Sequence, residues 1–94
     1  MYNDFDDRRN ELRELAFIDE SADYEVDQTS ICVDEDGTFI LLTASGCSCW
    51  SGEYDEEQFT SFEALEQSLL GDDRTYNPSL SGVQTLLEEA RKSL

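Results

Sequence analysis

Histidine is absent from the sequence, and its absence excludes several kinds of chemistry. The serines near the middle of the chain have no imidazole to activate them, so a histidine-based serine hydrolase is excluded. Structural zinc sites lose one of their usual ligand types. The acidic segment "DEDGTFILLTAS" also lacks the spacing and the closing glutamate of an EF-hand calcium loop. With no catalytic residue to name and no cofactor to assign, we expect a protein that is not an enzyme.

Basic residues are scarce as well: the chain has 6 of them against 23 acidic residues, which gives a net charge of −17. Nucleic acids and anionic membranes attract surfaces rich in lysine and arginine, so direct binding to DNA, RNA or a membrane is not expected. No apolar run approaches the length of about 20 residues that spans a bilayer. The N-terminal "MYNDFDDRR" is acidic where a signal peptide is basic and then apolar. We therefore expect a cytoplasmic protein with a basic protein partner.

The N-terminal half is predicted to form a helix followed by a β-hairpin. Over residues 4–17 one arc of a helical wheel collects the apolar side chains of Phe5, Leu12, Leu15 and Ala16. Residues 24–33 alternate as in a strand, and Asp36-Gly37 suits a two-residue type I′ turn into a second strand over 38–45. That turn would set Val33 opposite Ile40 and Ile31 opposite Leu42. The second strand is apolar on both faces, so we expect it in the centre of the sheet.

A third strand is predicted over residues 48–54, after a turn at Ser45-Gly46, with Trp50 and Tyr54 on one face.

Two helices are predicted in the C-terminal third of the chain. The first begins at a capping box of Thr60 and Glu63 and ends at Gly71. The second follows "YNP", where Asn77 or Ser79 can cap its first turn. Their apolar stripes are Phe62, Leu65, Leu69 and Leu70 in the first helix and Leu80, Val83, Leu86, Leu87, Ala90 and Leu94 in the second.

These elements predict an α+β fold in the order α-β-β-β-α-α. A small three-stranded antiparallel meander would be packed by three helices that cover one face of the sheet. The 94 residues suffice for one small domain, 1–94, and the 38% of hydrophobic residues can form its core. The net charge far exceeds the magnitude of about 2–8 that keeps a small domain soluble.

The stretch "SGCSCWSGE" contains two of the three cysteines and the only tryptophan. Cys47 and Cys49 are one residue closer than the Cys-x2-4-Cys pairs of zinc sites, and Cys-x-Cys is not the redox motif Cys-x-x-Cys. Cys32 can be a third thiolate with a carboxylate as fourth ligand, so a small zinc-binding domain stays as an alternative. We favour a structural role, in which the cysteines pack in a tight β segment and no metal is bound.

The segments "SGCSCWSGEYDEEQF" and "TSFEALEQSL" resemble sequences found in small acidic phage proteins, especially those of actinobacteriophages, that carry a GCSCW-type segment. The resemblance covers roughly residues 37–70. It implies a phage-encoded protein that acts in the cytoplasm of the host cell as an inhibitor or modulator of a host protein. It implies no catalytic residues.

Clustered carboxylates are the strongest functional signal in the sequence. Asp4, Asp7, Glu11 and Glu14 would form one stripe on the first helix, and a second cluster consists of Glu53, Asp55, Glu56 and Glu57. Dense rows of carboxylates can imitate the phosphates of a nucleic acid. We hypothesise that these residues engage the basic, nucleic-acid-binding surface of a host protein.

An alternative hypothesis assigns binding to aromatic and apolar contacts. Trp50, Tyr54 and Tyr76 would then be the anchors, because aromatic residues are frequent hot spots of protein interfaces. The acidic residues would serve only solubility, since charge runs are usually solvated faces.

Overall fold

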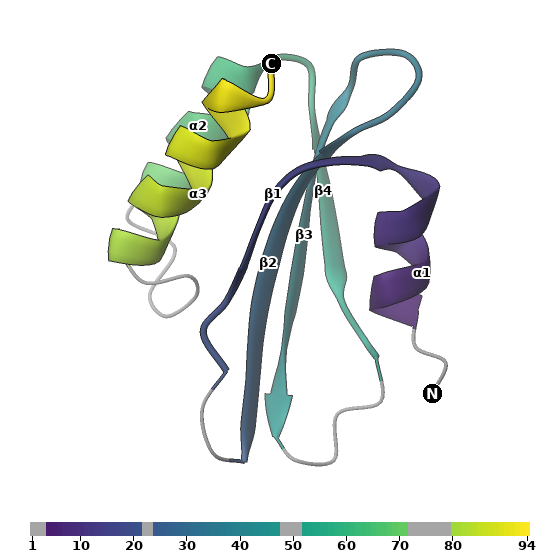
Figure 1. Ribbon diagram of the computed structural model, residues 1–94, viewed down its shortest axis with the longest axis vertical. Helices are drawn as coiled ribbons and strands as arrows, with labels where there is room; N and C mark the ends of the chain where they lie inside the picture. Colours follow the sequence, from purple (N-terminus) through teal and green to yellow (C-terminus); the bar gives the residue numbers. More distant parts are fainter. Residues whose placement is uncertain (1–3, 22–23, 48–51, 72–79) are drawn as a thin grey trace.

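The computed structural model describes residues 4–21, 24–47, 52–71 and 80–94. In chain order these residues form α1 (Asp4–Glu11), β1 (Arg13–Asp19), β2 (Glu25–Val33), β3 (Phe39–Cys47), β4 (Asp55–Phe59), α2 (Phe62–Leu70) and α3 (Leu80–Lys92). The strands build one antiparallel sheet in the order β1-β2-β3-β4 (Figure 1). The α+β class is confirmed. The predicted three strands and the order α-β-β-β-α-α are wrong, because the sheet has four strands.

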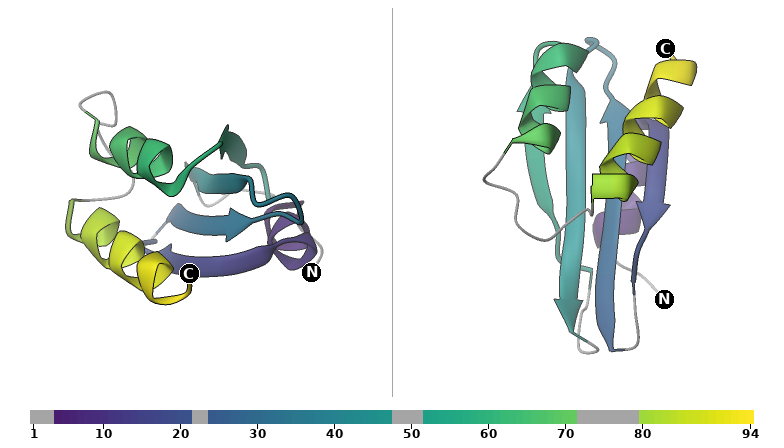
Figure 2. Two further views of the ribbon diagram at one scale, coloured as in Figure 1. Left: turned by 90° about the horizontal axis from the view of Figure 1, so that it is seen from above. Right: turned by 90° about the vertical axis from the view of Figure 1, so that its left-hand side faces the viewer.

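Helices lie on both faces of the sheet, with α2 and α3 on one face and α1 on the other (Figures 1 and 2). The prediction that all helices cover one face is therefore wrong. The core has two parts. The larger part lies under α2 and α3 and is built from Leu15, Ala16, Ile31, Leu41, Leu65, Leu69, Val83, Leu86, Leu87 and Ala90. The smaller part lies under α1 and consists of Phe5, Cys32, Ile40, Leu42 and Ala44. Burial on both sides explains why β3 is apolar on both faces, and its predicted interior position is confirmed.

The first helix is shorter than predicted, because residues 13–19 form strand β1. The alternation of β1 places Ala16 and Ile18 toward α3 and Phe17 toward α1. A bulge between Glu14 and Ala16 shifts the register, and Leu15 is buried on the same side as Ala16. Because Leu15 and Ala16 are both buried, their positions fit the apolar spacing of a helix, which explains why residues 13–17 were assigned to the first helix.

The β2–β3 hairpin has a three-residue loop where a two-residue type I′ turn was predicted. The amide of Gly37 donates to the carbonyl of Asp34 (3.1 Å), and Gly37 has φ +84°. A β-turn followed by a left-handed glycine is the usual form of this longer loop. Asp34 favours it, because its carboxylate accepts hydrogen bonds from the amides of Asp36 and Thr38 (2.9 Å each).

The longer loop shifts the register of the hairpin by one residue. Ile31 pairs with Leu41 and Val33 with Phe39, so the predicted pairs with Leu42 and Ile40 are wrong. The shift assigns Ile40 and Leu42 to the α1 face and Leu41 to the opposite face.

The predicted turn at Ser45-Gly46 is also wrong, since β3 continues to Cys47 and Gly46 lies opposite Val26. Of the predicted strand 48–54, residues 48–51 lie outside the described residues and 52–54 are not in a strand. The fourth strand is formed instead by residues 55–59, which pair with β3. Phe59 lies opposite Phe39 at the start of β3, and both pack against the larger core.

Helices α2 and α3 agree more closely with the sequence. Ser61, and not Thr60, caps α2, because its hydroxyl accepts a hydrogen bond from the amide of Ala64 (3.1 Å). The predicted end at Gly71 is confirmed. Leu70 and Leu94 were predicted to be buried, but they are 52% and 65% exposed.

The core residues predicted for α3 at positions 83, 86, 87 and 90 are all buried. Gly82 allows this helix to approach β1 closely, since a Cβ atom there would lie 2.7 Å from Cδ1 of Ile18. The predicted caps Asn77 and Ser79 lie outside the described residues. None of the helices in the described part of the chain has the length and apolar character needed to cross a membrane.

Candidate protein-interaction surface

Helix α1 carries a row of carboxylates along the flank that borders Tyr54. Phe5 is fully buried and fixes the helix on the sheet, and its amide donates to the carbonyl of Gly52 (3.1 Å). Asp4, Asp7 and Glu11 follow at three- and four-residue intervals, so they lie along about 10 Å of the helix axis. Asp4 and Glu11 are exposed, and Asp7 is half-buried. Acidic residues in the first turn of α1 also stabilise it through the helix dipole.

Arg8 joins α1 to β4. Its guanidinium binds Glu56 through two hydrogen bonds, from Nε (2.7 Å) and from Nη2 (3.1 Å), and it also binds Glu11 (3.1 Å). Of the second predicted acidic cluster, only Glu56 is thus brought next to α1. Glu56 is already paired, and its hydrogen bond with Arg8 holds its pKa below the usual range. Glu56 therefore has a structural role and contributes little net charge to this side.

Glu14 is not on the helix, and the predicted four-residue helical stripe is wrong at this position. Glu14 lies on β1 beneath α1, where Arg9 donates two hydrogen bonds to its carboxylate (2.6 and 3.0 Å). The hydroxyl of Ser30 donates a third (2.5 Å). Burial raises the pKa of Glu14, but the hydrogen bonds from Arg9 and Ser30 outweigh burial and keep the pKa below its usual value. The Arg9 guanidinium also stacks on Phe17, 3.8 Å from the ring centroid.

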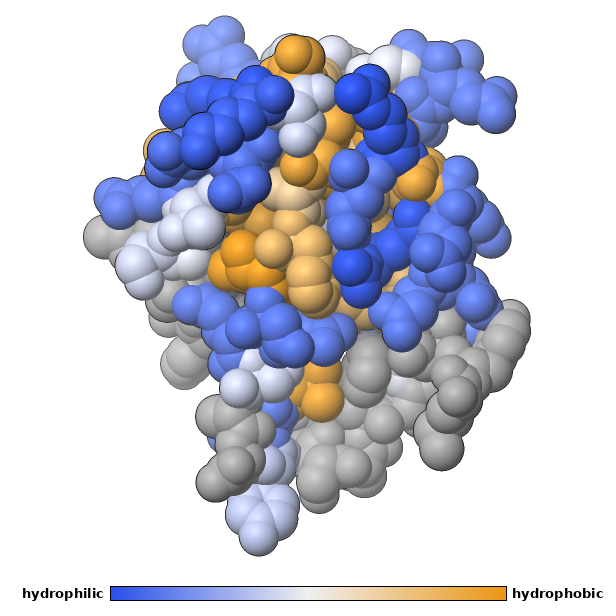
Figure 3. Space-filling model, in the orientation of Figure 1, coloured by the Kyte–Doolittle hydropathy of each residue, from blue (hydrophilic) through white to orange (hydrophobic). Residues whose placement is uncertain are grey.

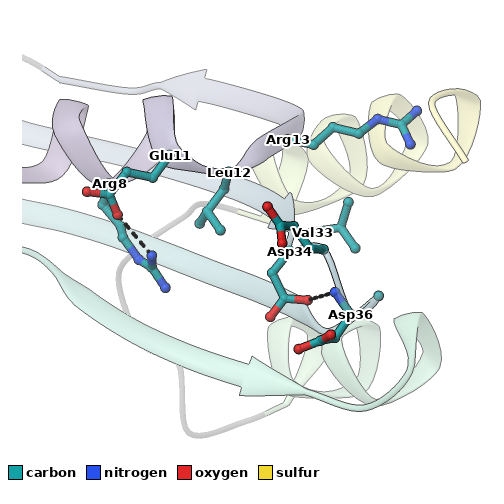
Figure 4. Close-up of a pocket in the computed structure, with 9 residues that line it drawn as sticks. Arg8, Glu11, Leu12, Arg13, Val33, Asp34 and Asp36 are labelled. Atoms are coloured by element: carbon teal, nitrogen blue, oxygen red, sulfur yellow. Dashed lines mark hydrogen bonds and ion pairs between the residues drawn. The ribbon is translucent and has the colours of Figure 1, made fainter.

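A cleft of about 700 Å³ separates the end of α1 from the β2–β3 hairpin (Figure 4). Leu12 and Val33 line it with apolar atoms, and Glu11 borders it on the α1 side. The opposite border is the hairpin loop with its consecutive carboxylates Asp34, Glu35 and Asp36. Arg13 borders the cleft but extends toward α3 (Figure 4), where it donates to the carbonyl of Ser93 (3.0 Å). The surface is therefore acidic on both borders of the cleft.

The hairpin carboxylates were not among the predicted binding residues, although three consecutive acidic residues in a tight turn were visible in the sequence. Their importance depends on the position of α1, which the sequence does not reveal. We call Asp4, Asp7 and Glu11 of α1, together with Asp34, Glu35 and Asp36 of the hairpin, the acidic ridge.

The remaining predicted residues are spread over other parts of the molecule. Glu53 is exposed in the segment before β4. Asp55 and Glu57 are exposed on β4 and alternate with Glu56, so they lie on the sheet side that carries α2 and α3. Tyr54 is half-buried and packs against Phe5, with the ring centroids 6.1 Å apart. Trp50 and Tyr76 lie outside the described residues.

The cysteines are arranged unfavourably for a shared metal site. Cys32 is buried under α1, bonds to the hydroxyl of Ser30 (3.2 Å), and has a thiol pKa raised by burial. It pairs with Ile40 on β3, whereas Cys47 lies seven residues further along that strand, about 23 Å away. The suggestion that Cys32 supplies a third thiolate beside Cys47 is therefore wrong. Within the described residues there is no group of three or more metal-ligating side chains. Cys49 lies outside the described residues.

Comparison with protein-family models, with curated proteins and with solved structures found no match.

Proposed function

We propose that this protein is a non-enzymatic acidic interaction protein. Its acidic ridge binds the basic, nucleic-acid-binding surface of a host protein and so inhibits that protein. The resemblance to small acidic phage proteins supports a phage-encoded inhibitor acting in the host cytoplasm. The alternative based on aromatic anchors has less support, because Tyr54 packs against Phe5 and holds α1 in place.

One observation carries the proposal: Glu11 at the end of α1 and the hairpin carboxylates border one cleft, while the nearby arginines bind groups of the same chain. Asp4 and Asp7 border an adjoining hollow that also includes Glu11. Arg8 is held by Glu56 and Glu11, and Arg13 by the carbonyl of Ser93. These cations stabilise the fold without covering the hairpin carboxylates. A basic side chain from a partner could lie with its aliphatic stem on Leu12 and Val33 and its charge near the ridge.

The ridge has spacing suited to a phosphate-binding surface. Three carboxylates along about 10 Å of α1 are comparable to the phosphates of one nucleic-acid strand, which are about 3.4 Å apart along the axis, at lower density. Complementary charge raises the association rate and makes the affinity fall with salt. The expected partner is therefore released by salt.

The test compares two variants that lose the same number of charges. The ridge variant carries Asp4→Asn, Asp7→Asn and Glu11→Gln. The control carries Glu63→Gln, Glu88→Gln and Glu89→Gln on α2 and α3. Each variant loses one exposed ion pair, Arg8–Glu11 or Lys92–Glu88. The ridge variant loses two acidic residues from the first turn of α1, and the control loses one from the first turn of α2.

Affinity capture from host lysate at low and high salt is the measurement, with circular dichroism to confirm that both variants fold. We expect the wild type and the control to retain a specific basic protein that elutes as salt rises, and the ridge variant to lose it. Equal loss in both variants would mean that only net charge matters. Unchanged retention by the ridge variant would refute the proposed surface.

A further inference from the structure

Strand β4 is an edge strand of the sheet and is regular along its whole length. It has one neighbour, β3, among the described strands, and their register contains no bulge. Its residues from Asp55 to Gln58 are all exposed. A regular exposed edge presents unpaired backbone groups that can accept a further strand.

The hydrogen-bond alternation of the sheet identifies these backbone groups. The amide of Asp34 donates to the carbonyl of Thr38, so the even-numbered residues of β3 face β2. The odd-numbered residues of β3 then face β4, which directs the backbone of residues 55, 57 and 59 inward. The backbone amides and carbonyls of Glu56 and Gln58 consequently point away from the sheet.

The opposite edge is protected. Strand β1 carries the bulge at Leu15, and the hydroxyl of Ser93 donates to the carbonyl of Leu15 (3.2 Å). The C-terminal end of α3 lies beside this strand (Figure 2). From the β1 side, an apolar strip appears between the hydrophilic surfaces of the α3 and α1 sides (Figure 3). On β1 itself, Phe17 and Ile18 are half-buried. Bulges, charged side chains and a covering helix are common means of preventing strand addition. Of these, β4 has only charged side chains, so it is the edge that can accept a strand of complementary charge.

The side chains of β4 select the partner. A second copy of β4 would set carboxylates opposite carboxylates, and like charges in cross-strand pairs are destabilising. A strand with lysine or arginine at alternate positions would instead lie opposite Asp55 and Glu57. We propose that β4 binds an extended basic segment of the partner as a fifth strand of the sheet. This inference rests on the proposed function, since it assumes the same basic partner.

Proline at position 58 provides a selective test. Gln58→Pro removes one outward amide and leaves the inward ladder with β3 intact, since proline is tolerated where the N–H faces solvent. Gln58→Ala is the matched control, because it keeps the amide and loses the same side-chain hydrogen bond to Glu56. The probe is a synthetic peptide as long as β4 that alternates lysine and threonine. A second peptide of the same sequence carries N-methyl groups on alternate backbone amides.

Binding is measured by calorimetry at low salt. We expect Gln58→Pro and the N-methylated peptide each to weaken binding at least about tenfold, as expected for a lost backbone hydrogen bond with a steric clash. Gln58→Ala should stay within about twofold, because the backbone bond that it keeps carries most of the effect. In the wild type, the amides of Glu56 and Gln58 should exchange with solvent more slowly once peptide is bound.

The outcomes separate the two proposals. Equal binding by Gln58→Pro and Gln58→Ala, with unchanged exchange of these amides, would overturn strand addition. The proposed function would still stand in that case if the ridge variant lost its partner. A ridge variant that keeps its partner while Gln58→Pro loses the peptide would refute the ridge and retain β4 as the binding edge.

Discussion

Thr29→Val should make the protein more stable, although it removes a hydroxyl from the centre of the sheet. Thr29 is 0% exposed, and no group in the described residues bonds to its Oγ1. Burying a hydroxyl without a partner costs about 1–3 kcal/mol, and a buried methyl group gains about 0.8 kcal/mol. Valine has the same shape and suits a strand, so we expect a gain of about 1–2 kcal/mol.

Ser30→Ala is the matched control, because the neighbouring Ser30 is also 0% exposed. Its hydroxyl donates to Glu14 (2.5 Å) and contacts the sulfur of Cys32 (3.2 Å), so its loss should cost about 1–3 kcal/mol. Urea unfolding followed by circular dichroism measures both effects at neutral pH. In thermal unfolding, each kcal/mol corresponds to a shift of about 4–8 °C in Tm for a domain of this size.

Opposite signs for two adjacent buried hydroxyls are the decisive result. A destabilised Thr29→Val variant would show that Oγ1 has a favourable partner in the folded protein. The reasoning from burial and hydrogen bonding would then be refuted at this position.

Further predictions concern pH and backbone conformation. The pKa values of Glu14 and Glu56 are lowered in the fold, so their ionised carboxylates stabilise the folded protein. This contribution is complete above the ordinary glutamate pKa of 4.5 and is lost as the pH falls through the lowered pKa values. The free energy of unfolding, measured over a series of acidic pH values, checks this. Burial, together with the charges of neighbouring carboxylates, raises the pKa of Asp27 above 3.8, so its ionisation costs stability above the folded value. Asp27→Asn should therefore be more stable than the wild type at neutral pH, and this difference should disappear in acid, as urea melts at two pH values would show. Gly37→Ala should lower the free energy of unfolding by about 1–2 kcal/mol because φ is +84°, although its Cβ atom would meet nothing within 4 Å. Gly37→Asn should lower it less, because asparagine tolerates this conformation better. Equal stability of the wild type and both variants would contradict the assigned turn.

The helical C-terminal third was largely predictable from the sequence, because its apolar periodicity is local. Residues 83, 86, 87 and 90 are buried as the spacing indicates, and Gly71 ends α2. The end residues Leu70 and Leu94 were misassigned, since periodicity alone does not show where the sheet stops covering a helix.

The N-terminal half was less predictable, because two local features changed its geometry. The bulge at Leu15 made a strand look helical. The carboxylate of Asp34, by bonding two amides of the loop, favoured a three-residue loop and shifted the hairpin register. Neither the bulge nor the loop length alters the pattern of apolar and polar residues, so that pattern alone does not predict them.

The negative charge of the candidate surface was predictable from the sequence, but the ion pairs between its carboxylates and the arginines were not. Asp4, Asp7 and Glu11 lie together as expected on one helix. Arg8 binds Glu56, which is 48 residues away in the sequence, and Arg9 binds Glu14 on the next element. Only the folded chain reveals these pairs.

Helix α1, with its eight residues, is the main cover over the smaller part of the core. Deletion of α1 would therefore have two effects. It would remove the carboxylates of the helix, and it would expose Ile40 and Leu42, whose side chains would promote aggregation of the truncated protein. An N-terminal truncation therefore cannot distinguish a loss of partner binding from a loss of folded structure. Single substitutions of Asp4, Asp7 or Glu11 can separate the two effects, because Phe5, Arg8 and Arg9 still hold the helix on the sheet.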